Sequence, residues 1–237
     1  MSDPAQSAAL PGFHVLRPEP AVEMAGDCAD AIRIVHRGPG DRPEVALTFD
    51  DGPARWTEEI AAVFERDGCR ATFFARGGAI AARPEEVAAL AGAGHEIGNH
   101  LWSHSDASTQ GREELRAEIE RTADAIEEAG APRPSLIRPP YFSAPRAVAE
   151  AAAGTGASAV TLRSIGSSDW AAESADQIVG PVLAHIQAGD IVCLHDGVSG
   201  DKRDTDSRQP TADAVAELVP ALLERGLRPV TVSQLLR

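Results

Sequence analysis

Two adjacent carboxylates, Asp50 and Asp51, follow a short run of apolar residues and stand directly before Gly52-Pro53. The run, residues 45–49, is typical of a buried strand, and the Gly-Pro pair ends it in a loop. Neighbouring side chains on a strand point in opposite directions, so the two carboxylates cannot do the same job unless the strand has already ended. Like charges this close repel each other unless a cation or a donor lies between them. The pair therefore predicts a metal ligand beside a base; the alternative is a turn with two solvated carboxylates.

His100 and His104 stand four residues apart in a segment that follows another strand-like run. Residues at this spacing share one face of a helical turn, so both imidazoles can reach one ion. Together with Asp51 they complete a set of two histidines and one carboxylate, which is the ligand class of a catalytic zinc with open coordination positions. The alternative is a pair of surface histidines in a polar loop.

Two more polar segments follow predicted strands. Residues 138–141 read Arg-Pro-Pro-Tyr, and because proline lacks a backbone N–H, the next backbone donor after the arginine is that of Tyr141, a candidate oxyanion donor. His195 ends another strand, where a histidine can act as an acid whose pKa a nearby carboxylate raises. Asp169 and Asp196 are both candidates for that carboxylate. The alternatives are a packed loop tyrosine and a buried, satisfied histidine.

Strand-like and helix-like segments alternate from residue 45 to the end of the chain. The predicted strands are residues 45–49, 71–75, 95–98, 135–138, 159–163, 191–194 and 229–232. The predicted helices are residues 57–67, 84–93, 111–129, 144–153, 174–188 and 211–225. This alternation is typical of an α/β fold in which helices cover a mostly parallel sheet.

Every candidate chemical group lies just after a predicted strand, as in barrels whose active sites form at the carboxyl ends of the strands. We therefore expect a closed (β/α) barrel that is smaller than the eightfold kind. An open, doubly wound sheet is the alternative. Its glycine-rich phosphate turn is missing, since Gly92-Ala93-Gly94 follows a predicted helix and precedes a predicted strand.

At 237 residues the chain is long enough for one large α/β domain or two small ones. Residues 1–43 contain six prolines and little periodicity, so we expect an irregular N-terminal arm packed on a barrel formed by residues 44–237. The net charge of −14 argues against nucleic acid or an anionic membrane surface as a partner, because both require basic patches. It suits a neutral or cationic substrate.

Cys28, Cys69 and Cys193 are far apart and form no CxxC pair, which argues against a disulfide framework and a cysteine zinc site. Residues 1–20 have no basic start and no apolar run, so no secretory signal is predicted. No apolar stretch approaches the ~20 residues that span a membrane. These features predict a cytoplasmic protein.

Taken together, these segments resemble the polysaccharide deacetylases of the NodB-homology type, carbohydrate esterase family 4. The likeness runs from about residue 45 to 236, and five family motifs occur in the family's order. They are TFDDGP at 48–53, HxxxH at 100–104, RPPY at 138–141, DW at 169–170 and LHD at 194–196. The resemblance implies a distorted (β/α)7 barrel and the metal-dependent removal of N-acetyl groups from N-acetylated amino sugars, in chito-oligosaccharide, peptidoglycan or a related glycan.

The resemblance also implies a role for each motif residue. It makes Asp50 the catalytic base, oriented by Arg138, and it makes His195 the general acid, held by Asp169. Tyr141 would offer its backbone N–H to the oxyanion. One divalent metal is implied, zinc in the first place, with cobalt or nickel as alternatives. Its ligands would be Asp51, His100 and His104.

Four residues are expected to wall the substrate pocket: Pro140, Phe142, Trp170 and Cys193. Two of them depart from the family pattern. Phe142 replaces a common glycine and should reshape the cleft, and Cys193 replaces a leucine and should leave the acyl pocket roomier. A third departure is Leu101, which stands where the family has a hydroxyl side chain that would brace the metal loop.

Two other functions remain open at this stage. The same barrel could bind a glycan or a partner without turnover, although a binder does not need both a base and an acid. Alternatively, the enzyme could deacylate a small amino-sugar metabolite, which a cytoplasmic location and a roomier pocket would suit. In each case the expected partner is an N-acetylated glycan or amino sugar, and no pattern in the sequence indicates an oligomeric state.

Residues 197–210 directly follow His195 and are long for a connection in which ~2–6 residues are usual. They are almost entirely polar, so most of the loop is expected to be solvated. As a hypothesis, its rim contacts sugar hydroxyls, since loops set specificity in such barrels. Deletion of residues 201–206 should then leave metal binding intact and change which chain lengths are accepted. Equal loss on every oligosaccharide, or no change on any, would contradict this prediction.

Overall fold

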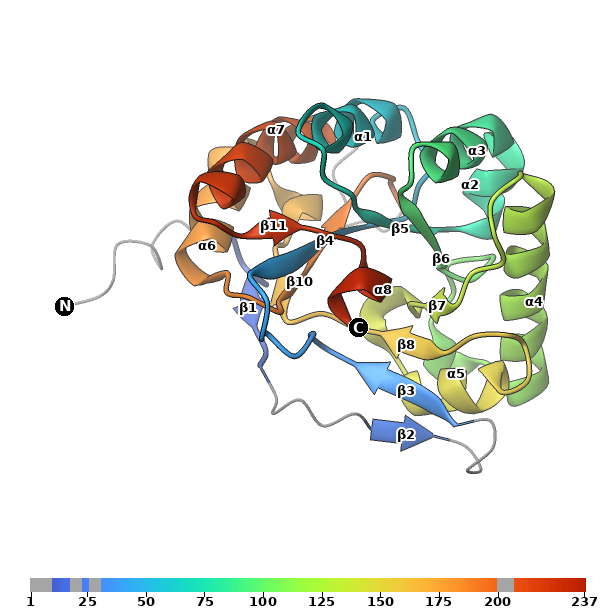
Figure 1. Ribbon diagram of the computed structural model, residues 1–237. Helices are drawn as coiled ribbons and strands as arrows, with labels where there is room; N and C mark the ends of the chain where they lie inside the picture. The colour runs from blue at the N-terminus through green and yellow to red at the C-terminus, as the bar shows by residue number, and fades with distance from the viewer. Residues whose placement is uncertain (1–9, 18–22, 26–30, 200–206) are drawn as a thin grey trace.

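The computed structural model describes residues 10–17, 23–25, 31–199 and 207–237, in which strands and helices alternate (Figure 1). The strands are β1 His14–Val15, β2 Glu23–Ala25, β3 Ile32–Val35, β4 Glu44–Asp50, β5 Thr72–Ala75, β6 Glu96–Asn99, β7 Leu136–Ile137, β8 Ala159–Thr161, β9 Ile165–Gly166, β10 Ile191–His195 and β11 Arg228–Pro229. The α-helices are α1 Thr57–Arg66, α2 Gly77–Ala82, α3 Pro84–Gly92, α4 Arg112–Glu128, α5 Pro145–Ala152, α6 Asp176–His185, α7 Gln209–Glu224 and α8 Val232–Leu235. Three short 3-10 helices are η2 Ala107–Thr109, η3 Pro140–Phe142 and η4 Asp169–Ala171.

The strands form one curled sheet with helices around its outside (Figure 1). Its order is β1-β9-β10-β4-β5-β6-β7-β8-β3-β2, and β11 adds to β4. The pairs from β9 through β10, β4, β5, β6, β7 and β8 to β3 are all parallel, whereas β1 and β2 pair antiparallel at the two ends. The carboxyl ends of the central strands therefore meet at one rim of the curl.

Strand β4 lies at the centre of this sheet, between β10 and β5. Its residues 45–49 are fully buried because both faces are covered, which explains an apolar run without alternation. The register places His195 of β10 beside Asp50 of β4. Two candidate chemical groups, Asp50 and His195, therefore lie at the same level of the rim. On its other side Asp50 lies beside Phe74 of β5.

An irregular segment of the chain between β8 and β9 connects the two sides of the curled sheet. These two strands follow each other in sequence, yet β8 pairs with β7 and β3, whereas β9 pairs with β10 and β1. Between them, Leu162 N donates to Val35 O at 2.7 Å and Ser164 N donates to Ile191 O at 3.0 Å. The predicted strand 159–163 is therefore split, and Arg163 leaves the sheet.

Helix α8 closes the opposite end of the curl, where the strands begin. It packs Val232 and Leu235 in one apolar cluster with strand residues such as Phe74. The backbone N–H of Val232 donates to the hydroxyl of Thr72 at 2.9 Å. The strand predicted over 229–232 is shorter, since β11 ends at Pro229. Thr231 forms a capping box with Gln234 and starts a helix instead.

The N-terminal residues contribute strands to the sheet as well. The predicted arm was irregular, whereas β3 pairs in parallel with β8 and buries Ile32 and Ile34. Strand β1 pairs antiparallel with β9, and this pairing places His14 opposite Gly166. Strands of two to four residues show too little periodicity to be found in a sequence. The division into an arm and a barrel at residue 43 stays a prediction.

Within the described ranges, no helix combines the length and the apolar character needed to cross a membrane. Cys28 and residues 201–206, on which the deletion hypothesis rests, lie outside the described residues. Cys69 and Cys193 are both buried free thiols.

Candidate active site and metal centre

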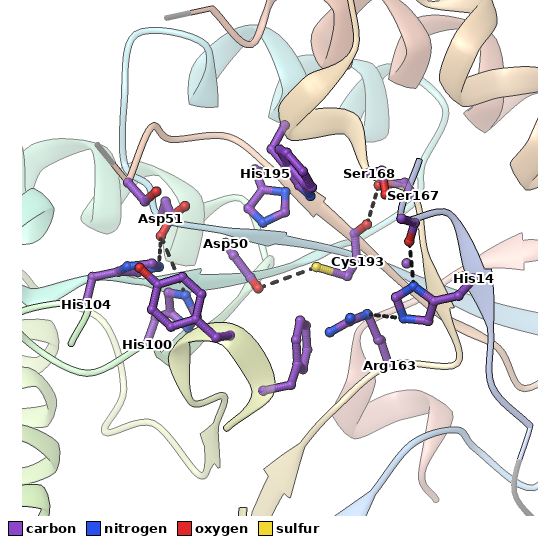
Figure 2. Close-up of a pocket in the computed structure, with 16 residues that line it drawn as sticks. His14, Asp50, Asp51, His100, His104, Arg163, Ser167, Ser168, Cys193 and His195 are labelled. Carbon is purple, nitrogen blue, oxygen red and sulfur yellow. Dashed lines mark hydrogen bonds and ion pairs between the residues drawn. The ribbon is translucent and has the colours of Figure 1, made fainter. Parts of the chain in front are cut away.

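A pocket of about 260 Å³ opens at the carboxyl ends of the central strands (Figure 2). The predicted site residues that line it are Asp50, Asp51, His100, His104, Tyr141, Phe142, Trp170, Cys193 and His195. These residues come from five separate stretches of the chain, so the curl of the sheet brings together what the sequence holds apart. Arg138 and Asp169 stand behind the lining and contact it through hydrogen bonds.

Asp51, His100 and His104 form a compact cluster at one side of this pocket (Figure 2). Asp51 Oδ1 lies 2.9 Å from His104 Nε2 and 3.6 Å from His100 Nε2. All three side chains are at most 9% exposed. Burial alone would raise the pKa of Asp51, but the neighbouring imidazoles of His104 and His100 hold that pKa below its usual range.

The donor atoms of this cluster fit a metal cation. His100 Nδ1 lies 2.7 Å from the backbone oxygen of Arg138, and since a carbonyl only accepts, Nδ1 carries the proton. His100 Nε2 therefore presents a lone pair toward Asp51. Asp51 Oδ1 is buried, and apart from its close contact with His104 Nε2 no group of the described residues donates a hydrogen bond to it. Lone pairs that converge in a buried position are favourable when a cation lies between them, and two imidazoles with one carboxylate suit a divalent metal.

The backbone that carries the ligands is in the left-handed region at three positions: Asp51 with φ 79°, Leu101 with φ 59° and His104 with φ 63°. Such conformations cost energy and persist only where their surroundings hold them. Asn99 Oδ1 accepts the N–H of Leu101 at 2.9 Å, and Glu118 Oε2 accepts the next two backbone N–H groups at 2.9 and 3.0 Å. The Leu101 side chain has no hydroxyl and is fully buried in an apolar cluster. The loop that carries the two histidines is therefore braced by Asn99 and Glu118 instead.

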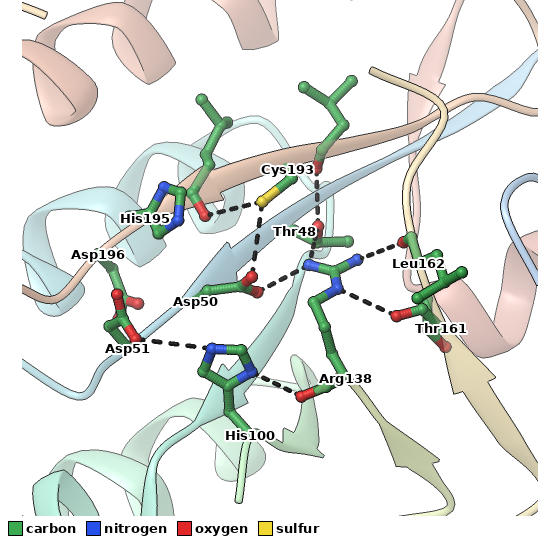
Figure 3. A network of polar contacts seen from close by, with 12 residues as sticks. Thr48, Asp50, Asp51, His100, Arg138, Thr161, Leu162, Cys193, His195 and Asp196 are labelled. Atoms are coloured by element: carbon green, nitrogen blue, oxygen red, sulfur yellow. Dashed lines mark hydrogen bonds and ion pairs between the residues drawn. The ribbon is translucent and has the colours of Figure 1, made fainter. Parts of the chain in front are cut away.

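Asp50 is held by a buried arginine (Figure 3). Arg138 Nη1 donates to Asp50 Oδ1 at 2.7 Å, and the guanidinium also donates to Thr48 Oγ1 at 2.7 Å and to Leu162 O at 2.9 Å. The thiol of Cys193 donates to Asp50 Oδ2 at 3.5 Å. Both charged side chains are at most 2% exposed. The carboxylate therefore has a fixed orientation and an ion partner, with its second oxygen directed into the pocket.

His195 forms a second dyad, with the buried Asp169, while its own side chain is 18% exposed. His195 Nδ1 donates to Asp169 Oδ1 at 2.8 Å, while Asp169 Oδ2 accepts the His195 backbone N–H at 2.8 Å and the Thr211 hydroxyl at 2.8 Å. Burial opposes the charge on the imidazole, but the Asp169 carboxylate outweighs it and raises the pKa of His195 to about 9. The imidazole is therefore protonated at neutral pH and faces the pocket.

Asp196, the other candidate partner of His195, points elsewhere. Its carboxylate accepts the N–H of Gly52 at 3.1 Å and the hydroxyl of Thr57 at 2.5 Å, so it braces the turn that follows Asp51. Burial, together with the charge of Asp51, raises the pKa of Asp196 to about 7. His195 and Asp196 are neighbours at a strand end, so their side chains point to opposite sides and the Asp196 carboxylate cannot reach the imidazole. Asp169 comes from another segment and can.

The remaining predicted residues lie around the mouth and the walls. Tyr141 has a left-handed backbone, with φ 58°, and its ring stands 5.0 Å from that of His104. Phe142, Trp170 and Cys193 line the pocket as expected. Pro140 does not line it; it is buried at the start of η3, where it shapes the turn that carries Tyr141.

Sequence reasoning missed several pocket residues. His14 and Gly12 reach the pocket from the N-terminal segment, and Arg163 reaches it from the irregular segment between β8 and β9. A lone histidine in a proline-rich stretch gives no signal, and Arg163 was predicted inside a strand. In the loop after His195, Ser199 lines the pocket, whereas Arg208 is fully buried and donates to Gly197 O at 2.9 Å.

Comparison with known proteins agrees with the geometry. The family model described as polysaccharide deacetylase matches residues 37–160. A chitooligosaccharide deacetylase from Sinorhizobium fredii is 36% identical over 203 residues, covering 83% of this chain and 94% of the relative. A peptidoglycan-N-acetylglucosamine deacetylase from Bacillus cereus is 34% identical over 201 residues, covering 84% and 91%.

Solved structures show the same fold. The crystal structure of the Bc1960 peptidoglycan N-acetylglucosamine deacetylase superposes with a TM-score of 0.78 at 29% identity, covering 86% of this chain and 92% of that one. A family 4 carbohydrate esterase from Streptomyces lividans gives a TM-score of 0.70 at 31% identity, covering 81% and 92%. The expected distorted barrel is thereby confirmed. By sequence and by fold, the chain belongs to the polysaccharide deacetylase family, carbohydrate esterase family 4.

Proposed function

We propose that the protein is a metal-dependent deacetylase that hydrolyses the N-acetyl group of N-acetylated amino sugars. The observation that carries the proposal is the meeting of three devices in one pocket. These are the metal-ligand cluster around Asp51, the Asp50–Arg138 pair and the His195–Asp169 dyad. A base and an acid beside a cation site are what hydrolysis of an unreactive amide requires.

Asp51, His100 and His104 would hold the metal. Three protein ligands of this kind leave open positions, as in catalytic zinc sites, and we propose zinc, with cobalt or nickel as alternatives. When bound there, the ion supplies a Lewis acid that polarises the acetyl carbonyl and lowers the pKa of water. The left-handed backbone at Asp51 and His104 keeps both ligands aimed at the same point.

The other residues move protons and hold charge. Asp50 takes a proton from the attacking water, whose oxygen adds to the acetyl carbon. The backbone N–H of Tyr141 is proposed to donate to the oxyanion that forms. His195 gives its Nε2 proton to the leaving nitrogen as the C–N bond breaks, because an amide anion is a poor leaving group. The products are acetate and a free amine.

The substrate class follows from the relatives. Those named above are deacetylases of chitooligosaccharide and of N-acetylglucosamine in peptidoglycan. We therefore propose an N-acetylated glycan or amino sugar as substrate. Acetate and primary amine should appear in equal amounts from N-acetylglucosamine oligomers incubated with the zinc-loaded protein. Tight oligosaccharide binding with no acetate over hours would instead favour a glycan-binding barrel.

The pH dependence should report on His195. Its acid form is present below a pKa of about 9, so kcat/KM should hold to about pH 9 and fall above it as the proton is lost. Asp169→Asn removes the carboxylate that raises the pKa of His195 and leaves the burial of the imidazole unchanged. The alkaline limb should therefore move to lower pH by one unit or more. A shift of one unit corresponds to a loss of about 1.4 kcal/mol of interaction with the charged imidazole.

The matched control for this prediction is Asp196→Asn, which changes a carboxylate of equal burial that bonds to Gly52 and Thr57. It should leave the position of the alkaline limb in place, whatever it does to the rate. An alkaline limb that stays at the same pH in Asp169→Asn would show that His195 is not the acid.

A further inference from the structure

Arg163 places a positive charge at the pocket wall opposite the metal ligands. It follows β8 in the irregular segment before β9 and lines the pocket together with His14 and Gly166. Figure 2 shows its guanidinium beside His14, on the side of the pocket away from Asp51 and His104, with Asp50 and Cys193 between. No step of the proposed hydrolysis uses this residue.

The orientation of Arg163 is set by His14. Arg163 Nε donates to His14 Nε2 at 3.0 Å, and His14 Nδ1 lies 2.7 Å from the carbonyl oxygen of Gly12. His14 is therefore the neutral tautomer with its proton on Nδ1, since it donates at one nitrogen and accepts at the other. A Cβ on Gly166 would lie 2.3 Å from His14 Cε1 and 2.8 Å from Arg163 Nε. The glycine makes room for this pair.

The rest of the guanidinium lacks an acceptor. Among the described residues, the bond to His14 is the one hydrogen bond that Arg163 makes, and no Asp or Glu oxygen lies within ion-pair distance. The Phe142 ring covers one face, with its centroid 3.5 Å from Arg163 Cζ. Stacking on a face leaves the in-plane N–H donors of both Nη atoms for a planar ligand. Asp50 is already engaged by Arg138.

A partly buried guanidinium without a carboxylate partner is unfavourable unless a ligand supplies one. Burial removes water from the guanidinium, and this desolvation lowers the pKa of Arg163 from its ordinary value. The two Nη groups match the two oxygens of a carboxylate in a forked pair of hydrogen bonds.

We propose that Arg163, oriented by His14, is an anion subsite that binds a carboxylate of the substrate, so that the preferred substrate is an N-acylated amino sugar carrying a carboxylate. This rests on the proposed deacylase function and narrows its substrate class. The carboxylate has two chemical sources: the far end of the acyl group, or a substituent of the sugar ring. The amide bond that breaks is the same in both cases.

Binding of simple carboxylates tests the subsite without any turnover. Calorimetry on the zinc-loaded protein should compare acetate, malonate, succinate and glutarate. At least one dicarboxylate should bind about tenfold or more tightly than acetate, a gain typical of charge-assisted hydrogen bonds. Arg163→Gln should abolish that gain and leave acetate bound at the metal, because one acetate molecule cannot contact the metal and Arg163 at the same time. Because no hydrolysis is needed, failure of the proposed enzymatic function would not hide the result.

Kinetics then separate the two sources. If the acyl group carries the carboxylate, N-succinylglucosamine should be hydrolysed with a higher kcat/KM than N-acetylglucosamine. If the ring carries it, N-acetylmuramic acid should be the better substrate. In each case Arg163→Gln should lower kcat/KM for the carboxylate substrate far more than for the neutral one and so remove the preference, and Arg163→Lys should retain part of it.

The matched control is Arg121→Gln, which removes an arginine that also stacks on an aromatic ring at 3.5 Å, that of Trp102, but does not line the pocket. It should preserve every preference. Dicarboxylates that bind no better than acetate in the unmodified protein would overturn the proposal. So would an Arg163→Gln variant that weakens all ligands equally, since Arg163 would then serve only to hold Phe142 and the pocket wall.

Discussion

His100→Ala should abolish tight metal binding and, with it, acetate release. The change removes one of the three proposed protein ligands and leaves only Asp51 and His104 in the cluster. Loss of a partner that merely supports a ligand already costs about 10–100-fold in metal affinity or activity, so loss of the ligand itself should exceed that. Zinc content after gel filtration, and acetate release from N-acetylglucosamine oligomers, would measure both effects.

The control for this variant is His185→Ala, which removes an imidazole that contacts Phe13 and Pro181 and does not line the pocket. It should keep its zinc and its rate. A His100→Ala protein that is folded and retains both stoichiometric zinc and acetate release would remove the metal cluster from the mechanism.

Asp50→Asn should reduce kcat by about 10²–10⁴, the range that general-base catalysis contributes. The amide keeps the shape of the side chain but cannot take a proton from water. Zinc content should stay at one equivalent, because Asp50 is not among the three proposed ligands, Asp51, His100 and His104. The variant should also be less stable, by about 3–5 kcal/mol at most, since Arg138 loses its buried ion partner.

Asp190→Asn is the matched control for Asp50→Asn. Asp190 is buried and pairs with an arginine in the same way, with Arg17 Nη2 at 2.7 Å, but it lies outside the pocket. This control should lose stability and keep kcat. If Asp50→Asn lowered kcat less than about tenfold with zinc bound, another group would have to be the base.

Much of the scaffold could be predicted because its signals are local. The continuous apolar run before Asp50 became the central strand β4, and the helix expected over 111–129 became α4, Arg112–Glu128, with Leu115 and Ile119 buried. The metal-ligand cluster was equally visible, since Asp51 and the two histidines carry a familiar spacing. The strand, the helix and the His100–His104 spacing each lie within about twenty residues of chain, where periodicity and motif spacing apply, and Asp51 was joined to the histidines by its place at a strand end.

What could not be predicted depends on contacts between distant segments. From the residues alone, Asp169 and Asp196 were equal candidates for the partner of His195, and only the family resemblance pointed to Asp169. The predicted strand ended at residue 194, and the observed one ends at His195. A shift of one residue reverses the side to which the next carboxylate points. His14 and Arg163 meet only because β1 pairs with β9, and each of these strands is two residues long.

The most direct test of the proposed active site is a titration of metal-free protein with zinc while acetate release from N-acetylglucosamine tetramer is recorded. One metal held by Asp51, His100 and His104 predicts a rate that rises linearly to one equivalent of zinc and stays flat beyond it, with one free amine formed per acetate. Acetate release that is complete before zinc is added, or that never appears at any zinc level on any N-acetylated sugar, would contradict the account.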